Sequence, residues 1–448
     1  MALNPIVERA LFALLMAVLL GTALARPRWF LFMLGLTIPL MTPRLEVGIG
    51  LDWYKIVGPL AIMLSVLNRR GAIGLRKTRT NWMLSYVAYA LVVTCVWMFV
   101  EYSFLQRYRL AAAMEMGGGI AQNMLKMPVQ LGSVLGQVAA IFAVPLWANS
   151  LRDCHVAIYG VASGVALSIG AGLAGWVLFG VATINISGPG GVLVYSDFTL
   201  SRLGGLSGEP KFLAMSIAMV LACALSYDVF GSGKRRVTWA VVLLVGALFL
   251  TGSTSGIGAA AAGVAAICLL ALANPGRSRL GTLLVLVVSG VIVITGVGFV
   301  GAVLESRVVE RLFGDAGDLD QQKDMYVFRI FADEPANAIF GYGLGGVDLA
   351  VIPYVEWIHL KYKRTPTPGV TVVRLLGDLG IVGLVLLSGI ATAWSRLLKR
   401  AGDLVGASFM IAGLAVAMLG SLMGITVYLF IAGALLTAAA LRRDGIVA

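Results

Sequence analysis

Long apolar stretches alternate with short polar connections along almost the whole chain. Many of them approach the roughly 20 residues that a helix needs to cross the hydrocarbon core of a bilayer, so each predicts a transmembrane helix. The stretches are 10–25, 29–42, 55–67, 81–103, 130–149, 155–180, 212–230, 237–252, 256–274, 281–303, 372–395, 404–420 and 423–441. We therefore predict an all-α polytopic membrane protein with about 12 or 13 transmembrane helices, the number in the first 70 residues being open.

Composition excludes a soluble fold. The chain has 448 residues, of which 59% are hydrophobic and 12% charged, and its mean hydropathy is +0.92. That leaves too little polar surface for a soluble globule of this length. The cysteines (Cys95, Cys154, Cys223 and Cys268) lie in or beside apolar stretches, without a CxxC pair or an accompanying set of histidine ligands. Neither a disulfide framework nor a metal or other cofactor is indicated. Arg9 before an apolar run is typical of a signal peptide, but the apolar stretches continue, so we expect this segment to be retained.

The basic residues lie in short connections between the apolar stretches. The formal charge of +12 is not gathered on one helix or loop, which argues against a nucleic-acid partner. Lysine and arginine beside short loops are retained on the cytoplasmic side of a membrane. The groups are Arg69-Arg70 with Arg76-Lys77, Lys234-Arg235-Arg236, Arg277 with Arg279, Arg396 with Lys399-Arg400, and Arg442-Arg443. Their alternation with the apolar stretches predicts a multi-pass protein of the inner membrane, with all five groups on its cytoplasmic face.

This orientation places three longer hydrophilic stretches on the opposite side: 104–129, 181–211 and 304–371. The last is the longest polar segment, and a long loop in a chain with few others is more often functional than a mere connection. We therefore interpret residues 1–448 as a single transmembrane domain containing a large periplasmic loop at 304–371. Within that loop, 304–312 and 325–332 carry apolar residues at helical spacing, which indicates short amphipathic helices on the membrane surface. The alternative is a loop that only packs as a cap.

Four segments carry a resemblance to a known family. They are RLGGLSGEPKFLA (Arg202–Ala214), LTGSTSGIGA (Leu250–Ala259), DEPANAIFGYGLGG (Asp333–Gly346) and RLLGDLGIVGLVLL (Arg374–Leu387). In this order they resemble conserved segments of the O-antigen polymerase and O-antigen ligase superfamily. Each segment alone is short and rich in glycine. Their order around one large loop makes the resemblance specific over roughly residues 200–390, whereas the first half of the chain matches only in hydropathy.

Two departures from the family pattern bear on the activity. Thr254 stands where the family has an arginine in the turn between two spans. Gly369 and Val370 stand where ligases of the family carry a histidine followed by a polar residue. His359 is in the same loop but further upstream. These departures favour a polymerase over a ligase.

The resemblance implies periplasmic glycosyl transfer. An oligosaccharide carried on undecaprenyl diphosphate would be joined to a hydroxyl of an acceptor sugar with inversion, so that repeat units polymerise into a surface polysaccharide or exopolysaccharide. The implied partners are the undecaprenyl-diphosphate-linked oligosaccharide and membrane lipid, and a polysaccharide chain-length regulator is left open. Departure of a diphosphate calls for fixed positive charge, which arginine supplies through bidentate hydrogen bonds. The acceptor hydroxyl needs a carboxylate or histidine within hydrogen-bond reach.

The basic candidates for binding diphosphate or sugar lie in the predicted external stretches or at their borders. They are Arg202, Lys211, Arg329, Arg364 and Arg374. Each has a structural alternative. Arg202 suits an interfacial residue that extends its side chain to water, Lys211 suits an ion pair with Glu209 at a helix start, and Arg329 suits a surface pair with Asp333 at i,i+4.

The candidates for the base are Glu209, Glu356, His359 and Asp378. A lone exposed histidine is more often inert than catalytic, and Asp378 is spaced i,i+4 from Arg374, so these two either neutralise each other or line the donor cavity. Three other activities compete with the polymerase: a ligase that transfers polymer to lipid A core, an oligosaccharyltransferase acting on protein, and a flippase for lipid-linked oligosaccharides. A flippase is expected to show repeated halves, which the sequence does not display.

Overall fold

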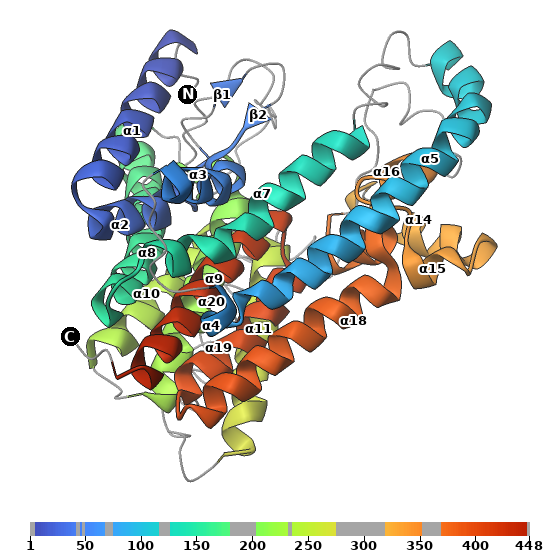
Figure 1. Cartoon of the computed structure of the whole chain (residues 1–448). Helices are drawn as coiled ribbons and strands as arrows, with labels where there is room; N and C mark the ends of the chain where they lie inside the picture. The colour runs from blue at the N-terminus through green and yellow to red at the C-terminus, as the bar shows by residue number, and fades with distance from the viewer. Residues whose placement is uncertain are drawn as a thin grey trace, which may run out of the picture. The chain divides into compact units, whose positions relative to one another are not determined.

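The computed structural model describes residues 5–41, 45–46, 50–67, 75–115, 126–179, 203–231, 235–274, 319–351 and 369–445. Helices dominate these residues (Figure 1). Their bounds are α1 (Pro5–Ala25), α2 (Pro27–Thr37), α3 (Trp53–Leu67), α4 (Leu75–Thr78), η1 (Thr80–Trp82), α5 (Met83–Glu115), α7 (Lys126–Trp147), α8 (Leu151–Phe179), α9 (Pro210–Phe230), α10 (Arg235–Leu250), α11 (Thr254–Leu272), α14 (Leu319–Asp333), α15 (Asn337–Phe340), α16 (Val347–Ala350), α18 (Thr371–Arg400), α19 (Leu404–Leu419) and α20 (Leu422–Arg443). Within the described ranges, the strands are the antiparallel pair β1 (Leu45–Glu46) and β2 (Gly50–Leu51).

Seven helices in the described part of the chain are long and apolar enough to cross a membrane. They belong to η1 with α5, and to α7, α8, α9, α11, α18 and α20. Shorter apolar segments lie in α1, α3, α10 and α19: Arg9–Ala25, Trp53–Leu67, Val237–Leu250 and Leu404–Leu419. The prediction of a helical multi-pass membrane protein is confirmed at this level. Where the predicted apolar stretches fall on described residues, each coincides with a helix, and the stretch 281–303 lies outside them.

Two of the predicted external stretches contain helix. Helix α5 continues to Glu115, well into the stretch 104–129, and residues 104–115 are rich in leucine, alanine, arginine and methionine, which favour helix. The stretch 304–371 contains α14, α15 and α16. The predicted amphipathic segment 325–332 falls in α14, whereas 304–312 lies outside the described residues. On which side of a membrane these segments lie stays a prediction.

The chain divides into two compact units. The larger unit comprises Met1–Thr80, Gly136–Asp315 and Ala391–Ala448, and the smaller unit comprises Asn81–Leu135 and Ala316–Ile390. Helices α7 and α18 begin in the smaller unit and continue into the larger one.

Close helix contacts in the larger unit depend on glycine. On α2 and α8, a Cβ added to Gly35 would lie 2.5 Å from the carbonyl oxygen of Ala157, and one added to Gly160 would lie 2.3 Å from that of Phe32. Between lipid-embedded helices there is little hydrophobic driving force, so association depends on such close packing of small residues. Helices α9, α11, α19 and α20 pack around a second contact region, where Ser226 and Ser408 hydrogen-bond at 3.2 Å.

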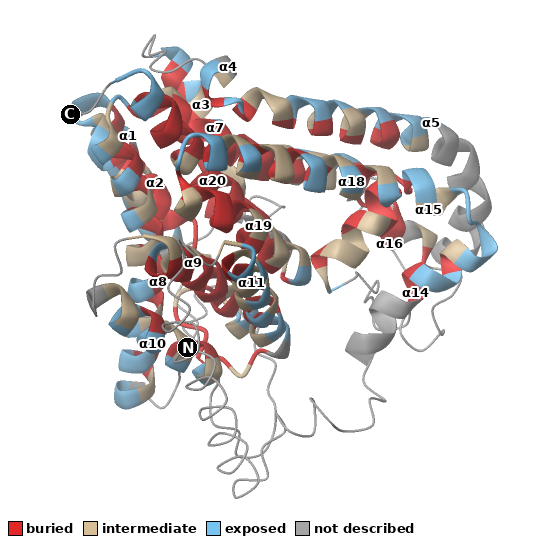
Figure 2. Ribbon diagram, turned by 90° about the horizontal axis from the view of Figure 1, so that it is seen from below, coloured by how far each residue is buried: buried red, intermediate tan, exposed pale blue. Residues whose placement is uncertain are grey.

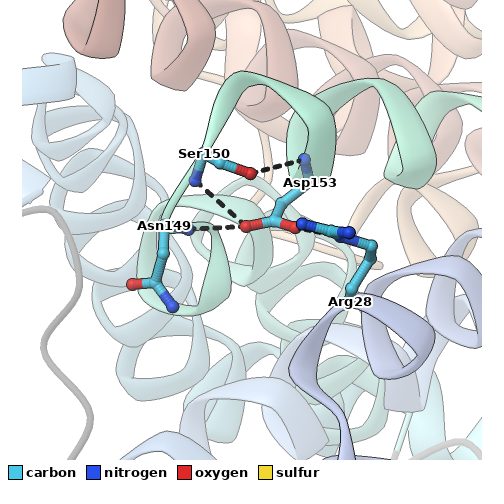
Figure 3. Close-up of polar contacts among 4 residues, drawn as sticks. All are labelled: Arg28, Asn149, Ser150 and Asp153. Carbon is cyan, nitrogen blue, oxygen red and sulfur yellow. Dashed lines mark hydrogen bonds and ion pairs between the residues drawn. The ribbon is translucent and has the colours of Figure 1, made fainter. Parts of the chain in front are cut away.

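The start of α8 is fixed by a reciprocal cap (Figure 3). The Ser150 hydroxyl accepts a hydrogen bond from the Asp153 backbone N–H at 3.3 Å, and the Asp153 carboxylate accepts from the N–H groups of Asn149 and Ser150 at 3.0 Å. This arrangement satisfies backbone donors that a helix start leaves open. Arg28 of α2 donates to the same carboxylate at 2.7 Å. The cap therefore also joins α8 to α2.

Several basic groups meet at one end of the larger unit. Lys77 pairs with Asp444 at 3.0 Å, which joins α4 to the residue after α20. Arg442 pairs with Asp403 at 3.1 Å, which joins α20 to the start of α19. Lys399 of α18 donates to Asn274, just after α11, at 3.2 Å. At this end, three of the five basic groups named from the sequence therefore form an ion pair or a hydrogen bond with a residue at the end of a neighbouring helix.

Candidate functional site

The predicted site residues fall into three sets. Arg202, Glu356, His359 and Arg364 lie outside the described residues. Glu209 and Lys211 belong to the larger unit, whereas Arg329, Arg374 and Asp378 belong to the smaller one.

In the larger unit, the first two family-like segments touch each other. The backbone N–H of Leu203 donates to the carbonyl oxygen of Leu250 at 3.1 Å. A Cβ added to Gly256 would lie 2.3 Å from the Cβ of Ala214, so helices α9 and α11 approach closely there. Ser253 caps α11 by accepting a hydrogen bond from the N–H of Gly256 at 3.2 Å. The two segments therefore form one local structure although they are far apart in sequence.

The turn before α9 presents the Glu209–Lys211 pair. In the same turn, the Ser207 hydroxyl donates to the carbonyl oxygen of Pro39 at 2.8 Å and lies 3.0 Å from the hydroxyl of Ser168. These bonds hold the turn against α8 and the end of α2. Lys211 and Glu209 form an ion pair of 3.1 Å, and both side chains are about half exposed. The predicted ion pair at the helix start is present, and both partners remain accessible to a ligand.

In the smaller unit, the third and fourth family-like segments also touch each other. The glycine-rich loop 341–346 lies on α18, where the N–H of Tyr342 donates to the carbonyl oxygen of Gly377 at 2.9 Å. The N–H of Gly345 donates to the Asp378 carboxylate at 3.0 Å. Gly341, Gly343 and Gly345 have φ values of 79°, 78° and 79°, a region that side chains with a Cβ rarely adopt. The alternating glycines therefore allow the loop to fold onto the helix.

Helix α18 is interrupted where this loop contacts it. Gly380 has φ 65° and ψ −172°, which is not helical. The hydroxyl of Tyr89, on α5, donates to the carbonyl oxygen of Leu379 at 2.8 Å and lies 3.2 Å from that of Phe340. A backbone group freed by a helix break inside a membrane must find a partner within the protein. Tyr89 supplies that partner from a neighbouring helix.

Three ionisable side chains are buried together beside the loop. Arg374 lies 3.5 Å from Asp348 and 3.7 Å from Asp378, with 13%, 1% and 2% of the respective side chains exposed. The predicted i,i+4 relation of Arg374 and Asp378 is therefore an ion pair, and Asp348 joins it. Two carboxylates face one guanidinium, so the charge of Arg374 is already compensated. This leaves Arg374 less suited than an exposed arginine to hold a diphosphate.

Arg329 is the accessible arginine of the smaller unit among the predicted residues. It lies exposed on α14, with its guanidinium carbon 5.8 Å from the centre of the Tyr326 ring. Below it, Tyr326, Ile330, Tyr342 and Val351 form a hydrophobic cluster. The hydroxyl of Tyr342 donates to Glu334 at 2.8 Å, which ties the end of α14 to the glycine-rich loop.

Sequence reasoning missed three residues that build this region: Asp348, Thr94 and Tyr89. Thr94 of α5 accepts a hydrogen bond from the N–H of Leu344 at 3.0 Å. A signal existed for the two α5 residues, since hydroxyl side chains inside an apolar stretch often hydrogen-bond to a neighbouring element. Asp348 carried the signal of an acid in an otherwise apolar run after the glycines.

Comparison of the chain with family models and with curated proteins finds no match. The likeness to the polymerase and ligase superfamily therefore rests on the four segments alone.

Proposed function

We propose that this protein is a membrane glycosyltransferase that polymerises undecaprenyl-diphosphate-linked oligosaccharide repeat units on the periplasmic side of a bacterial inner membrane. The observation that supports this most is the pairing of the four family-like segments. In the larger unit, the N–H of Leu203 donates a hydrogen bond to the carbonyl oxygen of Leu250. In the smaller unit, the N–H of Gly345 donates one to the carboxylate of Asp378. Segments that resemble one family in order, and that contact each other in pairs, are expected to serve a common structure.

In the proposed reaction, the acceptor hydroxyl attacks the anomeric carbon of the lipid-linked sugar. A new C–O bond forms, the bond to the diphosphate oxygen breaks with its electron pair, and undecaprenyl diphosphate leaves. A carboxylate takes the hydroxyl proton. Glu209 and Glu356 are the candidates that we favour for this role over His359, because the loop offers several acids and one histidine.

The proposed reaction needs positively charged side chains that stabilise the negative charge of the leaving diphosphate. Arg329 is exposed and is not buried between carboxylates, in contrast to Arg374. Lys211 is half exposed beside Glu209. We assign diphosphate or sugar binding to Arg329 and Lys211 within the described residues, and to Arg202 and Arg364 from the sequence.

A purified system tests the proposal. The protein is placed in lipid nanodiscs and supplied with lipid-linked oligosaccharides extracted from cells of the same species in which this gene is deleted. We expect lipid-linked glycan of higher mass and release of one undecaprenyl diphosphate for each linkage formed. A flippase would release none, and a ligase would form product only after addition of lipid A core; either result contradicts the proposal.

Variants in the same assay assign the residues. Arg329→Ala should lose most of the activity, with partial recovery in Arg329→Lys, which lacks the planar fork of donors. Arg400→Ala, at the exposed end of α18, serves as the matched control and should keep full activity. Glu209→Gln or Glu356→Gln should lower turnover about 100-fold or more, the scale expected for a general base, whereas His359→Ala should keep most of it. The reverse order would assign the base to His359.

A further inference from the structure

Two large apolar side chains of the smaller unit are exposed on the short helix α15. Ile339 is 47% exposed and Phe340 is 56% exposed. Figure 2 colours each residue by burial, with exposed residues such as Ile339 and Phe340 of α15 in pale blue. On α18 the exposed residues Ile381 and Val385 lie in the first turns after the helix break at Gly380. Exposed apolar residues on a membrane-spanning helix are expected to face lipid. Whether Ile339 and Phe340 also face lipid depends on the depth of α15 in the bilayer.

The backbone of α15 lies against residues inside two spans. A Cβ added to Gly380 would lie 2.2 Å from the carbonyl oxygen of Ile339 and 2.6 Å from the nitrogen of Phe340. Tyr89, which lies 3.2 Å from the carbonyl oxygen of Phe340, is inside the apolar span that begins at Thr80. Ile339 and Phe340 therefore lie at the depth of Gly380 and Tyr89 and not beyond the ends of these helices.

The depth of Gly380 follows from the charges on α18. No ionisable residue stands between Asp378 and Arg396. This uncharged stretch is about 25 Å long at roughly 1.5 Å per residue, which is less than the roughly 30 Å of a hydrocarbon core. The whole stretch, Gly380 included, therefore fits inside the core, at the end of the span farther from Arg396.

Several backbone polar groups of α15 have partners within the protein, as such a position requires: the N–H groups of Asn337, Ala338 and Ile339 donate to the carbonyl oxygens of Glu334, Pro335 and Ala336. The N–H of Gly341 donates to the carbonyl oxygen of Asn337 at 2.7 Å, and the N–H of Tyr342 donates to that of Gly377. The Tyr89 hydroxyl, which donates to the carbonyl oxygen of Leu379, also lies 3.2 Å from the carbonyl oxygen of Phe340. Non-helical backbone is tolerated at membrane depth when it is satisfied by protein in this way.

We propose that α15 is a re-entrant segment, with the side chains of Ile339 and Phe340 inserted among the acyl chains of membrane lipids in the leaflet farther from Arg396. Part of the stretch that the sequence assigns to a periplasmic loop then lies within the bilayer. Because the backbone of Ile339 and Phe340 lies against Gly380, the residue before Ile381, we infer that the lipid-facing surface of α18 extends onto α15. This inference does not depend on the glycosyltransferase proposal.

Nitroxide accessibility tests the position of Phe340. Phe340→Cys is introduced into protein whose four cysteines are replaced by alanine, labelled, and reconstituted in vesicles of phosphatidylethanolamine and phosphatidylglycerol. Collision of the nitroxide with oxygen, which gathers in lipid, is compared with collision with a water-soluble nickel chelate. Val385→Cys provides the lipid-facing control and Lys399→Cys the aqueous one.

We expect the ratio of oxygen to nickel collisions at position 340 to approach that at 385 and to exceed that at 399 several-fold. A ratio equal to that at 399 would place the residue in water and overturn the proposal. Low collision with both reagents would place it inside protein, which overturns the proposal equally. If the Phe340 variant fails to elute as folded protein, Ile339→Cys gives the same reading, because both side chains belong to the proposed surface.

Discussion

At the scale of single residues, the cluster of Arg374, Asp348 and Asp378 shows how a charged group is kept inside the smaller unit. Transfer of a charge out of water costs several kcal/mol, and an ion pair offsets this cost only when both partners stay in place. Asp378 also accepts a hydrogen bond from the N–H of Gly345. The cluster therefore stabilises the contact between the glycine-rich loop and α18.

Removal of Arg374 should destabilise the protein strongly. In Arg374→Ala the two carboxylates would be left buried without their shared cation, which is expected to cost about 3–5 kcal/mol. Arg329→Ala is the matched control, because the same residue type is exposed on α14 in the same unit and should change stability little. Thermal unfolding in detergent, followed by size-exclusion chromatography, measures both. Equal unfolding temperatures would show that the cluster does not stabilise the fold.

Tyr89 offers a second residue-scale test. Tyr89→Phe removes the hydroxyl that serves the carbonyl oxygen of Leu379 and keeps the ring. An unsatisfied carbonyl in a water-poor environment should cost about 1–3 kcal/mol. Tyr159→Phe, at an exposed tyrosine of α8, should have no measurable effect. The same unfolding measurement compares them, and an unchanged Tyr89 variant would mean that another group serves Leu379.

The sequence predicted part of this site. The i,i+4 spacing of Arg374 and Asp378 on an apolar helix predicted that they either neutralise each other or line a donor cavity, and the ion pair is present. Asp348 was missed because its approach to Arg374 depends on the fold of the glycine-rich loop, and an acid in an apolar run does not by itself show which residue it pairs with. The hydroxyls of Tyr89 and Thr94 stood out in an apolar stretch, but the loop backbone groups that they contact are far away in the chain and could not be predicted.

At the scale of elements, apolar length was sufficient to place the helices, but not to predict the break in α18. Gly377, Gly383 and Gly389 lie in the same helix with helical backbone, so glycine alone does not mark the break. Gly380 differs in its surroundings, because the backbone of Ile339 occupies the space where a Cβ would lie. The break therefore arises from packing between the loop and the helix.

Two glycine substitutions in α18 should have opposite effects. Gly380→Ala places a Cβ 2.2 Å from the carbonyl oxygen of Ile339 at a φ of 65°, so it should lower the unfolding temperature clearly. Gly389→Ala meets no atom within 4 Å, so it should be neutral or stabilise the helix by up to about 1 kcal/mol. A Gly380 variant as stable as the Gly389 variant would argue that the break is not required.

At the scale of the whole molecule, alternating basic groups predicted which helix ends share a side. The larger unit agrees with this in its own contacts, because Lys77 meets Asp444 and Arg442 meets Asp403 at one end. The division of the chain into two units had no signal in the sequence. Both units contain long apolar helices, and α7 and α18 take part in both.

The last prediction concerns the two ends of the larger unit. Ser207 lies beside Ser168, about 26 Å along α8 from Leu151 at roughly 1.5 Å per residue. The turn that presents Glu209 therefore lies well beyond the midpoint of α8 (Leu151–Phe179) and is distant from the cap at Ser150. Arg400, at the end of α18, is in the turn that leads to Asp403 and its partner Arg442. If the basic end is cytoplasmic, these two exposed positions face opposite sides of the membrane.

Single cysteines at these positions test the orientation in intact cells. Each is introduced into protein without the four native cysteines and exposed to a maleimide that does not cross the inner membrane. We expect labelling of Glu209→Cys in intact cells, and labelling of Arg400→Cys only after the membrane is permeabilised. Labelling of Arg400→Cys alone would invert the topology, and labelling of both would mean that the basic groups do not mark a cytoplasmic face. Either result would also remove the basis for placing the glycosyl transfer in the periplasm, since that placement depends on the same orientation.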